Sequence, residues 1–220
     1  FCPDDIANFV SNNLAIDVSG LFSDQYGYTI VEDNDQWYAF LTSRYQDRLY
    51  RLDFGNSLTN TPTIVNLNNP GSLLAAPEGI AFSKASGNWY AFVGSLNSSQ
   101  GIRRLDFRSS LTNTPTAIDI GNFGTSRTRS LKVIESNADR ILVLCDYSGN
   151  SITTINYRDS FDNSTTGFVS TTGVIPGIAN PFGIDLIRNG NDWLGFVASY
   201  NNNSLLQLNF GADIQSVPTV

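Results

Sequence analysis

Carboxylates and arginines are the side chains of this sequence that could do chemistry, because its 220 residues contain no histidine and only two cysteines. The chain therefore lacks the usual base for a serine or cysteine nucleophile and the usual nitrogen ligand of zinc. The run 32–35, Glu-Asp-Asn-Asp, has oxygen ligands at a density that suits calcium. The equivalent runs 86–88 and 189–191 are Ser-Gly-Asn and Asn-Gly-Asn, so a polar hairpin turn explains the position better. We predict no catalytic residue, no metal site and no cofactor.

Positions that vary between repeats are better candidates for a functional site, because shared residues build a scaffold and variable loops carry recognition. One set directly precedes a recurring small residue, on the loop entering each innermost strand. A second set lies seven residues after a recurring aromatic position. In the second repeat this position is occupied by Leu96. Stacking and charge-assisted hydrogen bonds from such residues would suit a polar or carbohydrate ligand, with ordinary loop variation as the alternative. The predicted ligand-binding residues are Tyr26, Glu78, Arg129, Phe182, Arg44, Tyr147 and Tyr200.

The scaffold behind these positions is a fourfold repeat of about 52 residues. Trp-Tyr-Ala-Phe stands at 37–40 and 89–92, and Trp-Leu-Gly-Phe at 193–196, twice that spacing further on. The motif Ser-Leu-Thr-Asn-Thr-Pro-Thr occurs at 57–63 and again at 110–116. A small residue, which we call the landmark position, lies ten residues before each aromatic position. The four landmark residues are Gly27, Gly79, Ser130 and Gly183.

Each repeat contains four short segments rich in β-branched and aromatic residues, at 79–82, 89–94, 102–107 and 116–120 in the second repeat. Four strands in about 52 residues are typical of a propeller blade. We predict an all-β fold with antiparallel strands, a single β-propeller domain over 1–220, with blades near 27–71, 79–124, 130–173 and 183–220. The segment 14–18 resembles a fourth strand and is expected to complete the last blade. We favour a closed four-bladed ring, while a fragment of a larger propeller stays open as the alternative.

Charge and composition exclude two classes of partner. The net charge of −7 argues against nucleic acid, which requires a basic footprint. No apolar run reaches 18 residues, so no direct membrane insertion is expected. For Cys2 and Cys145 we favour a buried thiol at Cys145 over a disulfide between them. The chain is expected to be part of a larger polypeptide or surface assembly.

The openings of two blades, Pro-Glu-Gly-Ile-Ala at 77–81 and Pro-Phe-Gly-Ile-Asp at 181–185, resemble the NHL-type propeller repeat. The longer pattern from 89–93 through 104–107 to 110–115 is similar to repeats of large secreted surface proteins of Bacteroidota, which are associated with gliding motility and type IX secretion. The third repeat departs from the pattern, with Arg140 in the tryptophan position and Ser130 in the glycine position. The resemblance implies a secreted or cell-surface module of adhesin type.

From these observations we predict a non-enzymatic binding or adhesion module, extracellular or on the cell surface. Its partner would be a glycan, a surface polymer or a protein, recognised by the loops at the propeller mouth. One alternative is a metal-dependent propeller hydrolase or lactonase, although on the inner strands only Glu78 and Asp185 are near candidates for ligands. The other alternative is a passive structural spacer.

Overall fold

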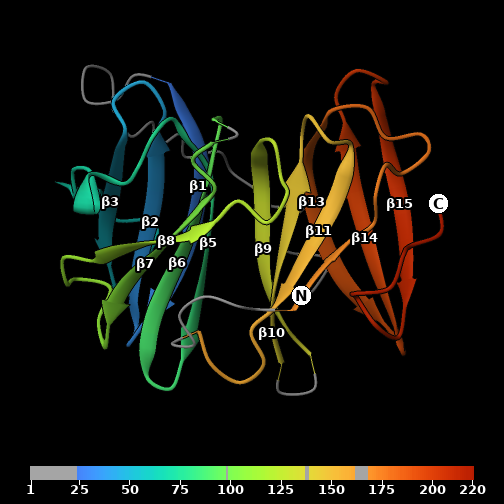
Figure 1. Cartoon of the computed structure of the whole chain (residues 1–220). Helices are drawn as coiled ribbons and strands as arrows, with labels where there is room; N and C mark the ends of the chain where they lie inside the picture. The colour runs from blue at the N-terminus through green and yellow to red at the C-terminus, as the bar shows by residue number, and fades with distance from the viewer. Residues whose placement is uncertain (1–23, 98, 137–138, 162–167) are drawn as a thin grey trace.

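Four antiparallel sheets stand in a ring and form a four-bladed β-propeller, which confirms the predicted fold class (Figure 1). The computed structural model describes residues 24–97, 99–136, 139–161 and 168–220. The inner strands lie nearest the centre of the molecule, and the later strands of each blade lie towards the periphery. The one helix within the described residues is the 3₁₀ turn η2 (Pro70–Ser72). No helix of this part of the chain is long and apolar enough to cross a bilayer.

The strands of each blade follow one another in sequence order, from the inner strand outwards. Blade A contains β1 (Gln25–Asp33), β2 (Gln36–Ser43), β3 (Arg48–Gly55) and β4 (Thr63–Asn66). Blade B contains β5 (Pro77–Ala85), β6 (Asn88–Ser95), β7 (Ile102–Arg108) and β8 (Thr116–Gly121). Blade C contains β9 (Thr128–Ser136), β10 (Asp139–Asp146), β11 (Ser151–Asn156) and β12 (Phe168–Thr171). Blade D contains β13 (Pro181–Asn189), β14 (Asp192–Ser199) and β15 (Ser204–Gly211).

The outer edge of blade D differs from that of the other blades. Within the described residues its sheet has three strands, and Thr219 forms an isolated antiparallel bridge with Asn209. The matching pair in blade A is Thr63 with Asp53, where β4 begins. The segment 14–18, which we expected to complete this blade, lies outside the described residues.

Apolar side chains fill three of the junctions between neighbouring blades. One cluster joins blades A and B around Phe40 and Phe107, whose ring centroids are 5.5 Å apart. A second joins B and C, where Phe92 packs edge-on against Phe161 at 4.9 Å. A third joins C and D around Val143 and other aliphatic residues. At the D–A junction, the described part of the chain instead exposes apolar side chains. These are Tyr28 and Ile30 of β1, Ile187 of β13, Phe196 of β14 and Leu205 of β15.

Recurring arginine–aspartate pairs bind neighbouring blades to each other. Arg51 holds Asp53 through both carboxylate oxygens and donates to the carbonyl oxygen of Leu111 in blade B, at 2.7 Å. Arg104 likewise pairs with Asp106 and donates to the carbonyl of Phe161 in blade C. These buried guanidinium groups satisfy loop carbonyls that would otherwise lack a partner. The repeat of Asp53 and Asp106 is therefore explained by blade packing.

The recurring tryptophans belong to the scaffold as well. Trp89 and Trp193 are buried between blades, and each lies under a cation from the neighbouring strand, Lys84 and Arg188 respectively. In blade C the same cross-strand pair is Glu135 with Arg140, so an ion pair at 3.9 Å replaces the ring and its cation. The substitution at position 140 keeps the pairing and changes only its chemistry.

The landmark position is small because the inner strands approach one another closely there. A Cβ atom on Gly27 would overlap the carbonyl oxygen of Glu78, and one on Gly79 would lie 2.6 Å from that of Arg129. Ser130 tolerates its own side chain, whose oxygen accepts from the backbone N–H of Ile184 at 3.4 Å. Gly183 faces open space, since a Cβ atom added there would have no neighbour within 4 Å. The close contacts thus follow the ring from A to D and are missing at the D–A junction.

Two substitutions at equivalent positions test this constraint. Gly79→Ala should lower the free energy of unfolding by about 1–3 kcal/mol, because the backbone of β9 must move away from the new methyl group. Gly183→Ala should change it by less than about 0.5 kcal/mol, since its methyl group meets open space. Denaturant unfolding of both variants measures the difference, and equal effects would contradict the role assigned to the close approach.

Candidate functional site

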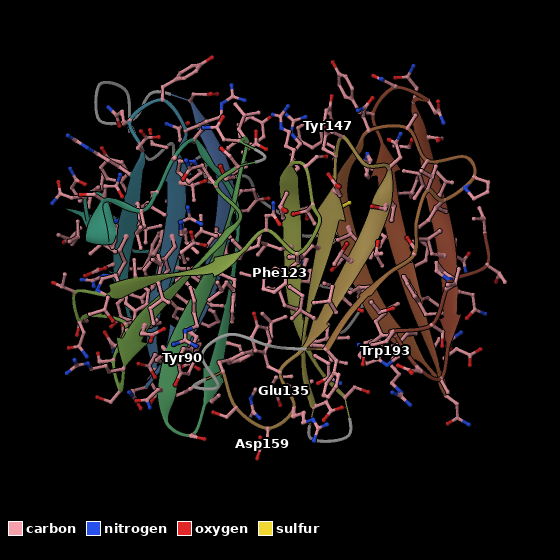
Figure 2. The ribbon with its side chains drawn as sticks, in the orientation of Figure 1. Tyr90, Phe123, Glu135, Tyr147, Asp159 and Trp193 are labelled. Carbon is pink, nitrogen blue, oxygen red and sulfur yellow. The ribbon has the colours of Figure 1, made fainter. Side chains whose placement is uncertain are left out.

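All seven predicted binding residues gather at one end of the propeller axis, which we call the mouth. Tyr26, Glu78, Arg129 and Phe182 lie near the starts of the inner strands β1, β5, β9 and β13. Arg44, Tyr147 and Tyr200 follow β2, β10 and β14 in the loops beside them. Figure 2 labels Tyr147 at this end, with Glu135 and Asp159 at the opposite end.

The same backbone hydrogen bond fixes the loop after the second strand of every blade. The N–H of Arg44 donates to the carbonyl oxygen of Asp24 at 3.0 Å, and Tyr147 donates to that of Arg127 at 2.9 Å. The pairs Leu96 with Ala76 and Tyr200 with Asn180 repeat the bond at 3.0 and 3.1 Å. The fold therefore holds two variable positions of each blade next to each other, and the side chains placed there determine the chemistry of the mouth.

Glu78 is the centre of the mouth, and its carboxylate is fully buried. Arg127 donates to both of its oxygens, from Nε at 3.0 Å and from Nη2 at 2.5 Å. Arg44 donates to it from Nη1 at 3.4 Å, and Nε of Arg129 lies 3.8 Å away. Three guanidinium groups from blades A and C therefore surround one carboxylate of blade B. Removing one member of such a buried set leaves unpaired charge, which typically costs about 3–5 kcal/mol.

A second carboxylate, Asp24, lies on the other side of Arg44. Its oxygen accepts a hydrogen bond from Nε of Arg44 at 2.6 Å, and about a quarter of its side chain is exposed. Burial alone would lower the pKa of Arg44, but Asp24, with help from Tyr45, outweighs burial and the pKa is raised. One guanidinium thus joins the two carboxylates of the mouth.

Aromatic rings surround Arg129. Its guanidinium carbon lies 3.9 Å from the ring centroid of Phe182, 4.5 Å from that of Tyr147 and 4.6 Å from that of Tyr26. The rings of Tyr26 and Phe182 stack at 6.1 Å, and Tyr200 packs against Phe182 at 6.0 Å. Burial lowers the pKa of Arg129, although nearby tyrosines and Asp24 oppose the effect. The stack of Tyr26 on Phe182 also connects blades A and D at the mouth.

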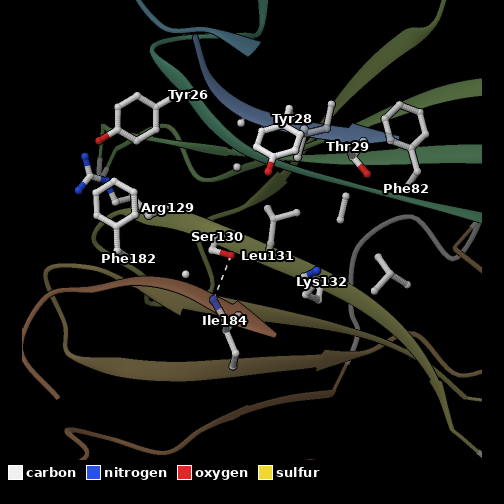
Figure 3. A pocket seen from close by; sticks show the side chains of 16 residues that line it. Tyr26, Tyr28, Thr29, Phe82, Arg129, Ser130, Leu131, Lys132, Phe182 and Ile184 are labelled. Carbon is white, nitrogen blue, oxygen red and sulfur yellow. Dashed lines mark hydrogen bonds between the residues drawn. The ribbon is translucent and has the colours of Figure 1, made fainter. Parts of the chain in front are cut away.

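Two hollows adjoin this cluster. A cavity of about 430 Å³ extends along the axis between all four inner strands, with Tyr26, Arg129 and Phe182 at one end (Figure 3). Deeper in, it is lined by Thr29, Phe82 and Lys132, among other residues. A shallow groove of about 490 Å³ lies outside, beside the exposed rings of Phe182 and Tyr200. The groove is also lined by Ser199, Asn203 and Ser204.

Sequence reasoning missed Asp24 and Arg127, which hold the predicted Arg44 and Glu78 in place. Both occupy the position three residues before the landmark, where blades B and D have Ala76 and Asn180. This position varies in charge between repeats just as the position before the landmark does. Counting both variable positions would have identified the complete cluster.

Other candidate chemistry is sparse in the described part of the chain. No group of three acidic or cysteine side chains there is arranged to hold a metal ion. Asp185, considered as a metal ligand, instead pairs with Lys132 at 3.0 Å. Cys145 is a buried free thiol, as expected, and burial with nearby Asp146 raises its pKa far above the usual value.

A thiol reagent tests the state of Cys145. In a Cys2→Ser variant, we expect no reaction with an aromatic disulfide reagent at pH 8 while the protein is folded, because the buried thiol does not form the reactive thiolate. Full reaction should appear in guanidinium chloride, which serves as the positive control. Rapid labelling of the folded variant would contradict this description of the core of blade C.

Comparison with known proteins identifies the fold and changes the functional interpretation. No protein-family model and no curated protein matches the sequence. Among solved structures, the chain resembles an exo-β-1,3-galactanase from Phanerochaete chrysosporium, with TM-score 0.64 and 10% identity over 90% of this chain and 49% of that one. It also resembles an endo-arabinase from Bacteroides thetaiotaomicron, with TM-score 0.62 and 12% identity over 90% of this chain and 78% of that one.

A third similar structure is an α-L-arabinofuranosidase from Podospora anserina in complex with cellotriose, with TM-score 0.63 and 14% identity, covering 92% of this chain and 69% of that one. The chain spans about half the length of the galactanase structures it matches. At these identities the likeness is one of fold alone, a β-propeller.

These findings correct two expectations. The predicted non-enzymatic binding or adhesion module is wrong, because the structures that this chain resembles in fold are glycoside hydrolases and not adhesion modules. The resemblance to NHL repeats and to gliding-motility surface proteins is supported only as far as the β-propeller itself. The blade-opening motif at 77–81 reflects the close approach of inner strands at Gly79, which is a packing requirement and not the mark of one family, so it misled the finer assignment.

Proposed function

We propose that this chain is a carbohydrate-active enzyme of the glycoside hydrolase kind, with a glycan bound over the mouth. The observation that carries the proposal is the pair of carboxylates, Asp24 and Glu78, joined by Arg44 at the axial end of the propeller. Glycosidic bonds are commonly hydrolysed by two carboxyl groups, one acting on the leaving oxygen and one on water or on the sugar itself.

The two carboxylates differ in access, and this difference suggests different roles. Asp24 is partly exposed and has its strongest contact with Arg44, so it is the better placed to contact a bound sugar. Glu78 lies beneath it and holds Arg127 through both oxygens. In this proposal Asp24 acts directly on substrate, and Glu78 supplies the second carboxylate and fixes the arginines around it.

The aromatic rim supplies a surface for sugar rings. Phe182 and Tyr200 expose 41% and 59% of their surface, more than the buried rings of the core, and they border the shallow groove. Stacking of a pyranose or furanose on such rings is favourable because each presents an apolar face and, for tyrosine, a polar hydroxyl. Asn203 and Ser204 along the groove offer hydrogen bonds to sugar hydroxyls.

A polymeric glycan is met outside the cell, which agrees with the predicted secreted or cell-surface location. The predicted role of a surface polymer changes accordingly from an adhesion partner to a substrate. Both statements remain parts of the proposal.

Hydrolysis of defined oligosaccharides tests the proposal. The protein is incubated with arabino-oligosaccharides and β-1,3-galacto-oligosaccharides, and released sugar is measured by anion-exchange chromatography. We expect turnover by the unsubstituted chain and a loss of about 10²–10⁴-fold in Asp24→Asn and Glu78→Gln, since the first removes the carboxylate that contacts the sugar and the second removes the charge that fixes the arginines around it.

Glu135→Gln is the matched control, because Glu135 is an exposed glutamate at the opposite end of β9. It should leave the rate unchanged. Circular dichroism melting of every variant separates lost activity from lost folding. Absence of turnover by the unsubstituted chain, or full activity of folded Asp24→Asn and Glu78→Gln, would overturn the proposal.

A further inference from the structure

Arg129 is a buried cation whose hydrogen-bonding capacity is unused by the described residues. Its side chain is only 9% exposed, and it makes no hydrogen bond to any described residue. Its Nε lies 3.8 Å from Glu78, beyond hydrogen-bond distance, and both oxygens of that carboxylate already accept from Arg127. Buried guanidinium groups elsewhere in this chain, such as Arg51 and Arg104, are bonded to carboxylates and carbonyls. Arg129 is therefore the exception.

The aromatic rings around Arg129 restrict how a partner can approach it. Tyr26, Tyr147 and Phe182 place their centroids within 4.6 Å of the guanidinium carbon, a distance at which cations lie over ring faces. The faces of the guanidinium are thus occupied by rings, and its N–H donors point along its edge. An edge of parallel N–H donors matches the two oxygens of a carboxylate.

The mouth concentrates arginines, although the whole chain has a net charge of −7. Three arginines, Arg44, Arg127 and Arg129, lie around Glu78, and Asp24 pairs with Arg44. The nearby carboxylate of Asp146 is committed to the backbone N–H groups of residues 126 and 127 and to the hydroxyl of residue 126. Arg129 is the guanidinium of this set that has no hydrogen bond to a carboxylate of the described residues.

We propose that Arg129 binds the carboxylate of an acidic sugar, so that the glycan taken at the mouth contains a uronic acid. The inference rests on the proposed function, in which a glycan occupies the mouth, and it adds the chemical class of that glycan. The planar carboxylate would bond to the free edge of Arg129, while the sugar ring lies against the exposed rings of Phe182 and Tyr200. A neutral sugar would offer this edge only hydroxyl oxygens, whose hydrogen bonds to a guanidinium are weaker than those of a carboxylate.

A matched pair of ligands tests the inference directly. Trigalacturonic acid and its methyl ester present the same sugar ring, but only the acid carries the carboxylates. Isothermal titration calorimetry should show that the acid binds at least about 10-fold more tightly than the ester, because one charge-assisted bidentate contact is lost in the ester. The preference should shrink as sodium chloride is raised from about 50 to about 500 mM, because salt screens the contact between the charges.

Variants assign the preference to Arg129. Arg129→Gln should bind acid and ester equally, whereas Arg188→Gln should keep the preference. Arg188 is the matched control, being an exposed arginine at the other end of β13. Melting curves show whether Arg129→Gln folds. If it does not, the acid–ester ratio of the unsubstituted chain and its dependence on salt decide the question.

The outcomes separate this inference from the proposed function. Equal binding of acid and ester, or a preference that folded Arg129→Gln retains, overturns the acidic-sugar site even if neutral oligosaccharides are hydrolysed. Competition by acetate as strong as that by the trisaccharide also overturns it, since the site would then be specific for a simple anion. Preferred binding of the acid without hydrolysis of any oligosaccharide supports the site and refutes the enzyme.

Discussion

The close approach of inner strands at the landmark position is the constraint on which the rest of this propeller depends. Gly27 meets the backbone carbonyl of Glu78, and Gly79 meets that of Arg129, at separations that leave no room for a side chain. Thr42 strengthens the first contact, because its hydroxyl donates to the Glu78 carbonyl at 2.6 Å and accepts from the N–H of Gly27 at 2.9 Å. Glycine is suited to a site where one backbone must reach another. The residues directly before these two landmarks, Tyr26 and Glu78, are consequently brought to the axis, whatever their side chains.

The same geometry brings charged side chains together at the mouth. Glu78 is drawn into the centre of the mouth, where a carboxylate without water is stable only with cations and hydrogen-bond donors around it. Arg127 supplies two bonds and Arg44 a third, and Asp24 then balances Arg44. Each of these charged groups has a hydrogen-bond partner within the cluster. Arg129 differs, because aromatic rings surround it instead of hydrogen-bond acceptors. A buried cation of this kind costs stability, and such costs are commonly retained where a ligand completes the pairing.

Repetition explains how much of this could be predicted from the sequence. Strand positions recur with the repeat, so the blades and the gathering of Tyr26, Glu78, Arg129 and Phe182 at one mouth followed from spacing alone. Arg127 was overlooked because its position lies outside the inner strand, on a loop that is held at the axis by the backbone bond to Tyr147 and by hydrogen bonds to Asp146. The proposed pair of carboxylates was also beyond the sequence. Two carboxylates separated by 54 residues have no spacing motif, and only the fold makes them neighbours.

The open D–A junction makes one side of the mouth different from the other. Three junctions are closed by apolar clusters, whereas at the fourth Gly183 meets no atom and the described contact at the mouth is the stack of Tyr26 on Phe182. Rings on that side consequently remain exposed, and the groove beside Phe182 and Tyr200 opens there. The opposite side, where β5 and β9 touch through Gly79, is closed. The mouth therefore presents exposed rings on blade D and charged groups on blades A, B and C, an arrangement that would suit the proposed ligand, a sugar with one apolar face and one anionic edge.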